Sequence, residues 1–120
     1  MEKKTILVVD DEKSIRLLCH EVLGEEGYHV IMAGDGREAI RKVEQERPDL
    51  VILDIQMARM DGMEALPIIL RKGRNIPVIL YTGYTQYQED FMSWAADAYV
   101  VKSSDFSKLR ETVHRLCPGR

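Results

Sequence analysis

Side chains able to bind a metal ion or attack an electrophile follow four strand-length apolar runs of this chain. They are Asp10 and Asp11 after Ile6–Val9, Asp54 after Leu50–Leu53, Thr82 after Val78–Tyr81, and Lys102 after Ala98–Val101. Apolar runs without polar alternation are typical of strands buried on both faces, as in parallel sheets covered by helices. Because ligands bind outside the carboxyl ends of strands in open parallel sheets, we expect these side chains to form one site.

Three carboxylates that lie close together cannot all stay ionised unless a cation compensates their charge. Mg²⁺, with Mn²⁺ as a substitute, suits such oxygen ligands and usually keeps several waters. Lys102 adds positive charge and Thr82 a hydroxyl, which together suit a phosphoryl group that a carboxylate attacks to give an aspartyl phosphate. Asp54 is the best nucleophile because it stands alone at its strand end, whereas Asp10 and Asp11 are adjacent and better arranged to hold the ion.

Each of these residues taken alone has a simpler interpretation. A single polar residue at a strand end is more often a helix cap or a solvated side chain. Asp11 could therefore cap the first helix, and Lys102 could lie at the surface. Four strand ends with complementary chemistry in one chain favour a shared site over this interpretation.

Strand and helix signals alternate along the chain, which is typical of a parallel α/β sheet. Strands are expected at Thr5–Val9, Tyr28–Ile31, Leu50–Leu53, Val78–Tyr81 and Ala98–Val101. Helices are expected after Ser14, Asp35, Asp61 and Ser104 or Asp105, with a short, loose helix between Gly83 and Trp94. Such units fit a doubly wound, five-stranded flavodoxin-like sheet of order 2-1-3-4-5, whose switch point lies between the first and third strands.

Three local signals refine the expected helices. Asp35 and Asp61 each precede a glutamate by three residues, which is the pattern of an N-cap with a reciprocal acid. Pro67 lies inside the apolar stripe of the third helix and is expected to kink that helix or delay its start.

Composition favours one soluble cytoplasmic domain over residues 1–120, with no effector domain. The net charge of −3 argues against nucleic acid as a partner, and no apolar run is long enough to span a membrane. No signal-peptide pattern precedes the first strand. Cys19 and Cys117 lack the spacing of a metal site or disulfide framework, so buried free thiols are expected.

Over nearly its whole length the chain resembles the receiver (CheY-like) domain of bacterial two-component response regulators. The resemblance rests on Thr82 and on the strings Ile6–Glu12, Asp35–Ala39, Arg47–Asp54, Met60–Gly62 and Tyr99–Lys102. It implies a (βα)5 receiver fold that acts in phosphorelay signal transduction. Such a domain is a phosphoacceptor with self-catalysed chemistry and not a turnover enzyme.

The resemblance also implies a role for each matching residue. Asp54 matches the phosphoacceptor, Asp11 the direct Mg²⁺ ligand, and Asp10 the ligand that acts largely through water. The backbone carbonyl of Gln56 would complete the protein ligands. Lys102 matches the lysine that pairs with the phosphoryl group.

Switching and signal lifetime are likewise assigned by resemblance. Thr82 matches the hydroxyl that moves onto the phosphoryl group, and Tyr99 the aromatic side chain that then turns inward. A simpler interpretation makes Tyr99 a half-buried strand aromatic. Gln56 and Tyr84 match positions that tune how water reaches the acyl phosphate, and Tyr84 is hypothesised to slow hydrolysis.

The implied phosphoryl donor is a phosphohistidine of a sensor histidine kinase or phosphotransfer domain. The implied output is a protein that docks on the fourth helix, fifth strand and last helix. Two departures stand out, since Ser103 and Ala58 stand where the family usually has prolines. The family proline at the position of Ser103 follows a cis peptide bond, and here that bond is either trans, with a rearranged loop, or cis and strained. The segment from Thr82 to Lys102 is also shorter than usual, so its helix is expected to be reduced.

Three other functions use part of the same pattern. A haloacid-dehalogenase-like phosphatase would carry a second aspartate at the position of Gln56. A flavin-binding protein of the same fold would carry a phosphate loop where Asp10 and Asp11 would repel the ligand. The remaining alternative is a receiver-like interaction module that is not phosphorylated.

Overall fold

A single parallel sheet forms the centre of the computed structural model, which describes residues 3–55, 57, 62–83, 95–103 and 105–118. Its strands are β1 (Thr5–Val9), β2 (His29–Ala33), β3 (Leu50–Leu53), β4 (Val78–Thr82) and β5 (Ala98–Val101). The strand order is β2-β1-β3-β4-β5, and every neighbouring pair is parallel. The predicted doubly wound order is therefore confirmed.

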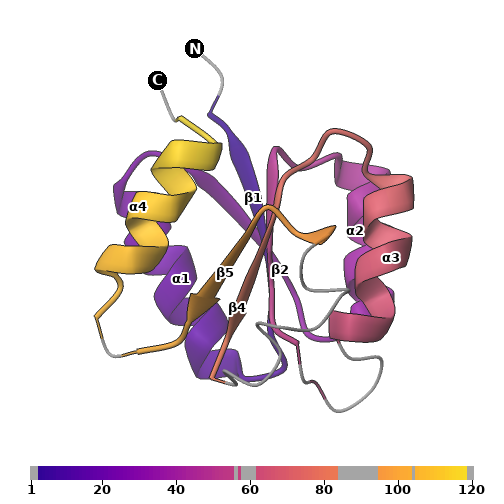
Figure 1. Cartoon of the computed structure of the whole chain (residues 1–120). Coiled ribbons are helices and arrows are strands. Elements are labelled where there is room, and N and C mark those ends of the chain that lie inside the picture. The colour runs from indigo at the N-terminus through magenta and orange to yellow at the C-terminus, as the bar shows by residue number, and fades with distance from the viewer. Residues whose placement is uncertain (1–2, 56, 58–61, 84–94, 104, 119–120) are drawn as a thin grey trace.

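Helices cover both faces of the sheet. They are α1 (Lys13–Glu25), α2 (Gly36–Glu46), α3 (Gly62–Lys72) and α4 (Ser107–Leu116). α1 and α4 lie on one face, and α2 and α3 on the other (Figure 1). The short helix predicted between Gly83 and Trp94 lies almost wholly outside the described residues, so α4 here is the last helix of the chain.

The central strand β3 shows why its sequence is apolar without interruption. Leu50 and Ile52 belong to the core cluster beneath α1 and α4, whereas Val51 and Leu53 belong to the cluster beneath α2 and α3. All four side chains are at most 1% exposed. A strand that contributes to two cores leaves no position for a polar side chain before it ends at the edge of the sheet.

Several local predictions are confirmed and others need correction. Asp35 caps α2 by accepting a hydrogen bond from the Glu38 N–H at 2.9 Å, while the Glu38 carboxylate accepts from Gly34 N–H at 2.8 Å. The prediction for β2 was wrong at both ends: it starts one residue later, and pairing with β1 carries it to Ala33. α3 runs through Pro67 from Gly62, so its start is not delayed.

The last helix begins at Ser107 beside the predicted cap. Phe106 occupies the N-cap position, and the Asp105 carboxylate accepts from the Ser107 N–H at 2.9 Å. Asp105 thus satisfies one free N–H of the first turn, as a cap does. Ser104 and Asp61, the other predicted caps, lie outside the described residues.

The far end of α4 is anchored by a contact that no sequence pattern predicted. The Tyr28 hydroxyl donates to the Cys117 carbonyl at 2.6 Å and lies 3.3 Å from His114 Nδ1.

Both cysteines are free and buried, as predicted, and burial raises the pKa of the Cys19 thiol to about 12. These thiols are therefore packing residues and not reactive ones.

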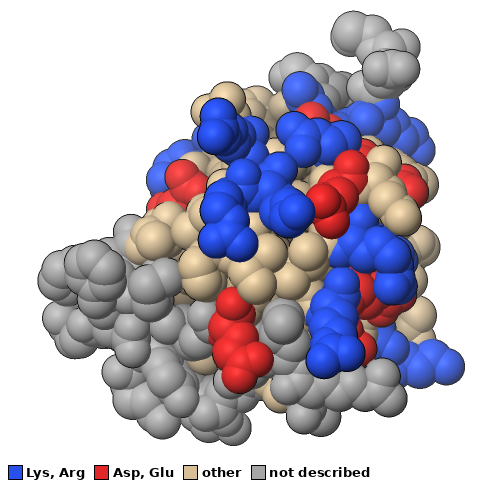
Figure 2. Space-filling model, turned by 90° about the vertical axis from the view of Figure 1, so that its right-hand side faces the viewer, with Lys and Arg blue, Asp and Glu red and all other residues tan. Residues whose placement is uncertain are grey.

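The outer surface of α2 and α3 carries mixed charge, with basic and acidic residues interspersed (Figure 2). Lys72 pairs with Glu44 at 3.1 Å, and Lys42 pairs with Glu38 at 3.7 Å. Within the described part of the chain, no helix has the length and apolar character needed to cross a bilayer.

Candidate functional site

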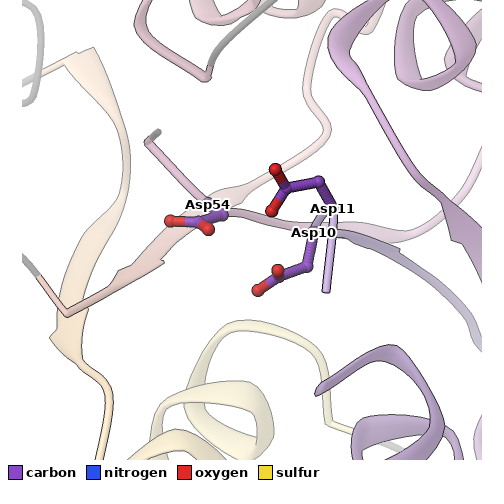
Figure 3. Close-up of side chains that lie close together, drawn as sticks. All are labelled: Asp10, Asp11 and Asp54. Atoms are coloured by element: carbon purple, nitrogen blue, oxygen red, sulfur yellow. The ribbon is translucent and has the colours of Figure 1, made fainter. Parts of the chain in front are cut away.

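The three predicted aspartates meet beyond the carboxyl ends of β1 and β3 (Figure 3). Neighbouring strands bring them together, because Val9 at the end of β1 lies opposite Leu53 at the end of β3. One carboxylate oxygen each from Asp10, Asp11 and Asp54 lies within 4.8 Å of the others. Asp10 and Asp54 are buried, whereas Asp11 is exposed, so the cluster opens to solvent on one side.

Lys102, which follows the outer strand β5 at the same carboxyl end of the sheet, supplies positive charge to this cluster. Its Nζ lies 2.7 Å from Asp10 Oδ2 and 3.2 Å from Asp54 Oδ2, and 3.9 Å from the exposed Glu12. Its backbone N–H donates to the Thr82 carbonyl at 2.7 Å. Burial acts to lower the pKa of Lys102, but the two aspartates outweigh it and raise that pKa, so the ammonium stays charged.

Asp54 carries negative charge that its surroundings do not fully compensate. Burial is the main cause that raises its pKa, and Asp10 adds to it, while Lys102 and Thr82 act in the opposite direction. Its Oδ1 is the one buried side-chain oxygen or nitrogen of the described residues that has no hydrogen-bond partner. A hard divalent cation such as Mg²⁺ fits this donor set, since it would satisfy that oxygen and neutralise the clustered carboxylates.

Asp10 is held by more contacts than its sequence motif indicates. Its carboxylate Oδ1 accepts from the Glu12 N–H at 2.9 Å, and its N–H donates to the Ala33 carbonyl at 3.1 Å. Arg16 Nη1, one turn into α1, donates to the Asp10 carbonyl at 2.7 Å. The alternative that Asp11 caps α1 is wrong, because Glu12 occupies the N-cap position and makes no side-chain cap bond.

The remaining predicted site residues fall into two groups. Thr82 ends β4 with 0% exposure, and Tyr99 in β5 is half-buried against the core beneath α2 and α3. Gln56 and Tyr84 lie outside the described residues, so their roles stay predictions. The Lys102–Ser103 peptide bond is trans, like every described peptide bond.

Gly62 is a site residue to which sequence reasoning assigned no role. Its N–H donates to the Ile55 carbonyl at 2.6 Å, which closes the loop that follows Asp54. A Cβ at this position would lie 1.9 Å from the Asp54 carbonyl oxygen and 2.8 Å from the Ile55 Cα. Because backbone atoms cannot yield as a flexible side chain can, only a residue without a side chain allows the Asp54 backbone to keep this position.

The strand order and the acidic switch point are those of a receiver domain of two-component signal transduction. The family model described as response regulator receiver domain matches residues 6–114, and the chain belongs to this family. Receiver domains are phosphoacceptors and in general not turnover enzymes.

Relatives of known name agree with this membership. Sporulation initiation phosphotransferase F of Bacillus subtilis is 36% identical over 120 residues, which cover 98% of this chain and 97% of that protein. Transcriptional regulatory protein PdtaR of Mycobacterium tuberculosis is 40% identical over 111 residues, which cover 88% of this chain but 53% of that protein.

Solved structures show the same fold at higher identity. Response regulator TrrA of Thermotoga maritima, in complex with Mg²⁺ and a beryllium fluoride, superimposes with a TM-score of 0.91 at 49% identity, covering 94% of this chain and 98% of that one. TrrA in complex with the histidine kinase ThkA gives a TM-score of 0.88 at 48% identity, covering 95% and 98%.

We predict that Gly62→Ala weakens Mg²⁺ binding and lowers the free energy of unfolding by about 1–3 kcal/mol, the usual cost of overpacking. The added methyl group must push the Asp54 carbonyl away and so displace its carboxylate. Isothermal titration with Mg²⁺ and urea denaturation measure the two effects.

Gly24→Ala is the matched control, because a Cβ there meets nothing within 4 Å. It should raise stability by roughly 0.5–1 kcal/mol through its helix propensity and leave Mg²⁺ affinity unchanged. Wild-type Mg²⁺ affinity in Gly62→Ala would show that this close approach does not position Asp54.

Proposed function

We propose that this chain receives a phosphoryl group on Asp54 from a phosphohistidine of a sensor histidine kinase or phosphotransfer domain. One observation carries the proposal: within the cluster of carboxylates, the buried Asp54 Oδ1 has no hydrogen-bond partner among the described residues. An oxygen held in this way is available both to a metal ion and to an electrophile. The covering ion is proposed to be Mg²⁺, held by Asp10, Asp11, Asp54 and the backbone carbonyl of Gln56.

The proposed transfer is an in-line displacement at phosphorus. A carboxylate oxygen of Asp54 attacks, the phosphorus–nitrogen bond breaks, and the imidazole nitrogen keeps the electron pair and takes a proton from solvent. Lys102 is already within 3.2 Å of Asp54 Oδ2 and pairs with the charged oxygens of the incoming group. When bound, Mg²⁺ supplies additional positive charge that stabilises the transferring phosphoryl oxygens.

The proposed output is a change of packing at the β4–β5 edge. Thr82 would move its hydroxyl onto the phosphoryl group, and Tyr99 would then turn inward. Converting a mostly inactive population to a mostly active one takes about 3–5 kcal/mol of differential stabilisation. A downstream protein would read this change at the segment before β5, at β5 itself and at α4.

The remaining parts of the proposal concern the chain as a whole. Residues 1–120 are proposed to act as one cytoplasmic receiver domain that turns over no substrate, apart from forming and losing its own acyl phosphate. Tyr84 and Gln56 are proposed to set the lifetime of that acyl phosphate. An interaction module that is not phosphorylated is the rival, and the pairing of Lys102 with Asp54 argues against it.

Incubation with acetyl phosphate and Mg²⁺ should add one phosphoryl group to the wild-type chain, as measured by intact mass. Asp54→Asn should show no adduct, because the amide cannot attack phosphorus, and chelation of Mg²⁺ should abolish the adduct in the wild type. Asp49→Asn is the matched control, since Asp49 is exposed and hydrogen-bonds Thr5 away from the cluster. A wild-type chain that gains no adduct would support the silent module instead.

Two exposed leucines on α1 are proposed to contact the kinase. Leu17 and Leu18 are 50% and 43% exposed, and their helix α1 begins at Lys13, two residues after Asp11. A phosphohistidine must approach Asp54 closely, so the protein that carries it would also contact the neighbouring surface of α1. The complex of the similar TrrA with the kinase ThkA supports a kinase as the occupant.

Replacing Leu17 and Leu18 by alanine should slow phosphoryl transfer from a kinase roughly tenfold or more, the effect of losing apolar anchors from an interface. The rate with acetyl phosphate should stay unchanged, because this small donor needs no docking surface. A panel of autophosphorylated histidine kinases that includes ThkA serves as donor, with exposed Gln45→Ala on α2 as the control. Equal losses with both kinds of donor would contradict the docking role.

A further inference from the structure

Tyr81 lies directly before Thr82 in β4 and faces the core beneath α1 and α4. Only 4% of it is exposed, so its ring is fixed by packing. The Lys102 Nζ lies 6.0 Å from the centre of this ring, within the range at which a cation is attracted to an aromatic face. Phe106 also packs against the Tyr81 ring, with ring centres 6.5 Å apart and planes tilted by 42°.

Lys102 requires positioning because it lies beyond the end of β5. Its backbone is tied to β4 through the Thr82 carbonyl, but the next residue is Ser103 in a trans peptide, with no ring to restrict the chain. Hydrogen bonds shape this turn instead. Ser103 Oγ donates to the Asp105 carbonyl at 2.8 Å, and the Asp105 carboxylate accepts from Ser107 Oγ at 2.7 Å. With these bonds the chain turns so that the Phe106 ring contacts the Tyr81 ring.

We propose that Tyr81, braced by Phe106, is a positioning residue that holds the Lys102 ammonium at the phosphoryl site. The inference rests on the proposed function, in which Lys102 pairs with the transferred group. Lys102 now contacts Asp10 and Asp54, and both carboxylates would turn toward a metal ion or the phosphoryl group during transfer.

The contact between Lys102 and the Tyr81 ring can persist when Asp10 and Asp54 turn from Lys102 to the metal ion or the phosphoryl group. The face of the Tyr81 ring is uncharged and, unlike a carboxylate, does not bind the metal ion. The ring also belongs to a strand that is buried in the core. It can therefore attract the ammonium both before and after the carboxylates change partners. If Tyr81 only filled space in the core, its replacement would leave the position of the Lys102 side chain unchanged, and this can be measured.

Tyr81→Leu removes the aromatic face and keeps an apolar side chain, whereas Tyr81→Phe keeps the face. With acetyl phosphate and saturating Mg²⁺, Tyr81→Leu should slow adduct formation roughly three- to thirtyfold, the scale of a partly desolvated cation–aromatic contact. Tyr81→Phe should retain the wild-type rate, and Mg²⁺ affinity should be the same in both variants. Ile79→Val, in the same strand and core cluster, controls for general loss of packing.

A double-mutant cycle with Lys102 separates positioning from packing. In a Lys102→Ala background, Tyr81→Leu should slow adduct formation no further, because the group it positions is gone. A loss that persists in that background, or a Tyr81→Phe variant as slow as Tyr81→Leu, would overturn the inference.

A spectroscopic readout tests the same contact without phosphorylation. Side-chain NMR resonances of Lys102 should stay at their wild-type positions in Tyr81→Phe and move toward those of a free lysine in Tyr81→Leu. Unchanged Lys102 resonances in Tyr81→Leu would refute the contact. A wild-type chain that takes no phosphoryl group would refute the proposed function, while the resonances would still decide the role of Tyr81.

Discussion

The site depends on how negative charge is held where β1 and β3 end. Parallel pairing places the end of one strand beside the end of the other, so their terminal carboxylates cannot separate without breaking the sheet. Lys102, from the outer strand β5, is the cation in contact with both buried aspartates. The pKa of Asp54 is nevertheless raised, chiefly by burial, and its buried Oδ1 has no hydrogen-bond partner among the described residues.

The same lysine connects the site to the β4–β5 edge. Lys102 contacts Asp54 through its ammonium and Thr82 through its backbone, while its side chain approaches Tyr81. A change in the charge on Asp54 therefore alters the surroundings of a residue that joins two strands. The central strands β3 and β4 are buried along their whole length, whereas β5 has one exposed and two half-buried residues, so we expect a change of packing to involve β5.

The sequence predicted the parts of the molecule that follow from periodic burial. Apolar runs such as Leu50–Leu53, each ending in a polar residue, were sufficient for the sheet, its order and the meeting of the aspartates. Asp35 was predicted as a cap because capping is a local interaction. The extension of β2 was missed because it comes from pairing with β1 and not from its own pattern.

Contacts between segments distant in sequence could not be predicted in this way. The importance of Gly62 lies in its approach to the Asp54 carbonyl, and that of Arg16 in reaching the Asp10 carbonyl. Tyr81 looks like any strand aromatic until the turn after β5 brings Lys102 over its ring. Each of these contacts requires the closed loops of the folded chain.

The free energy of unfolding of wild-type and Asp54→Asn protein at neutral pH, with and without Mg²⁺, tests most directly whether the acidic cluster is undercompensated. Folding raises the pKa of Asp54, chiefly through burial, so the ionised carboxylate lowers stability at any pH above that pKa. Without a divalent cation, Asp54→Asn should therefore be more stable than the wild type, by roughly 1–2 kcal/mol. Mg²⁺ should stabilise the wild type more than the variant. An Asp54→Asn variant that is less stable than the wild type without Mg²⁺ would contradict this view of the site.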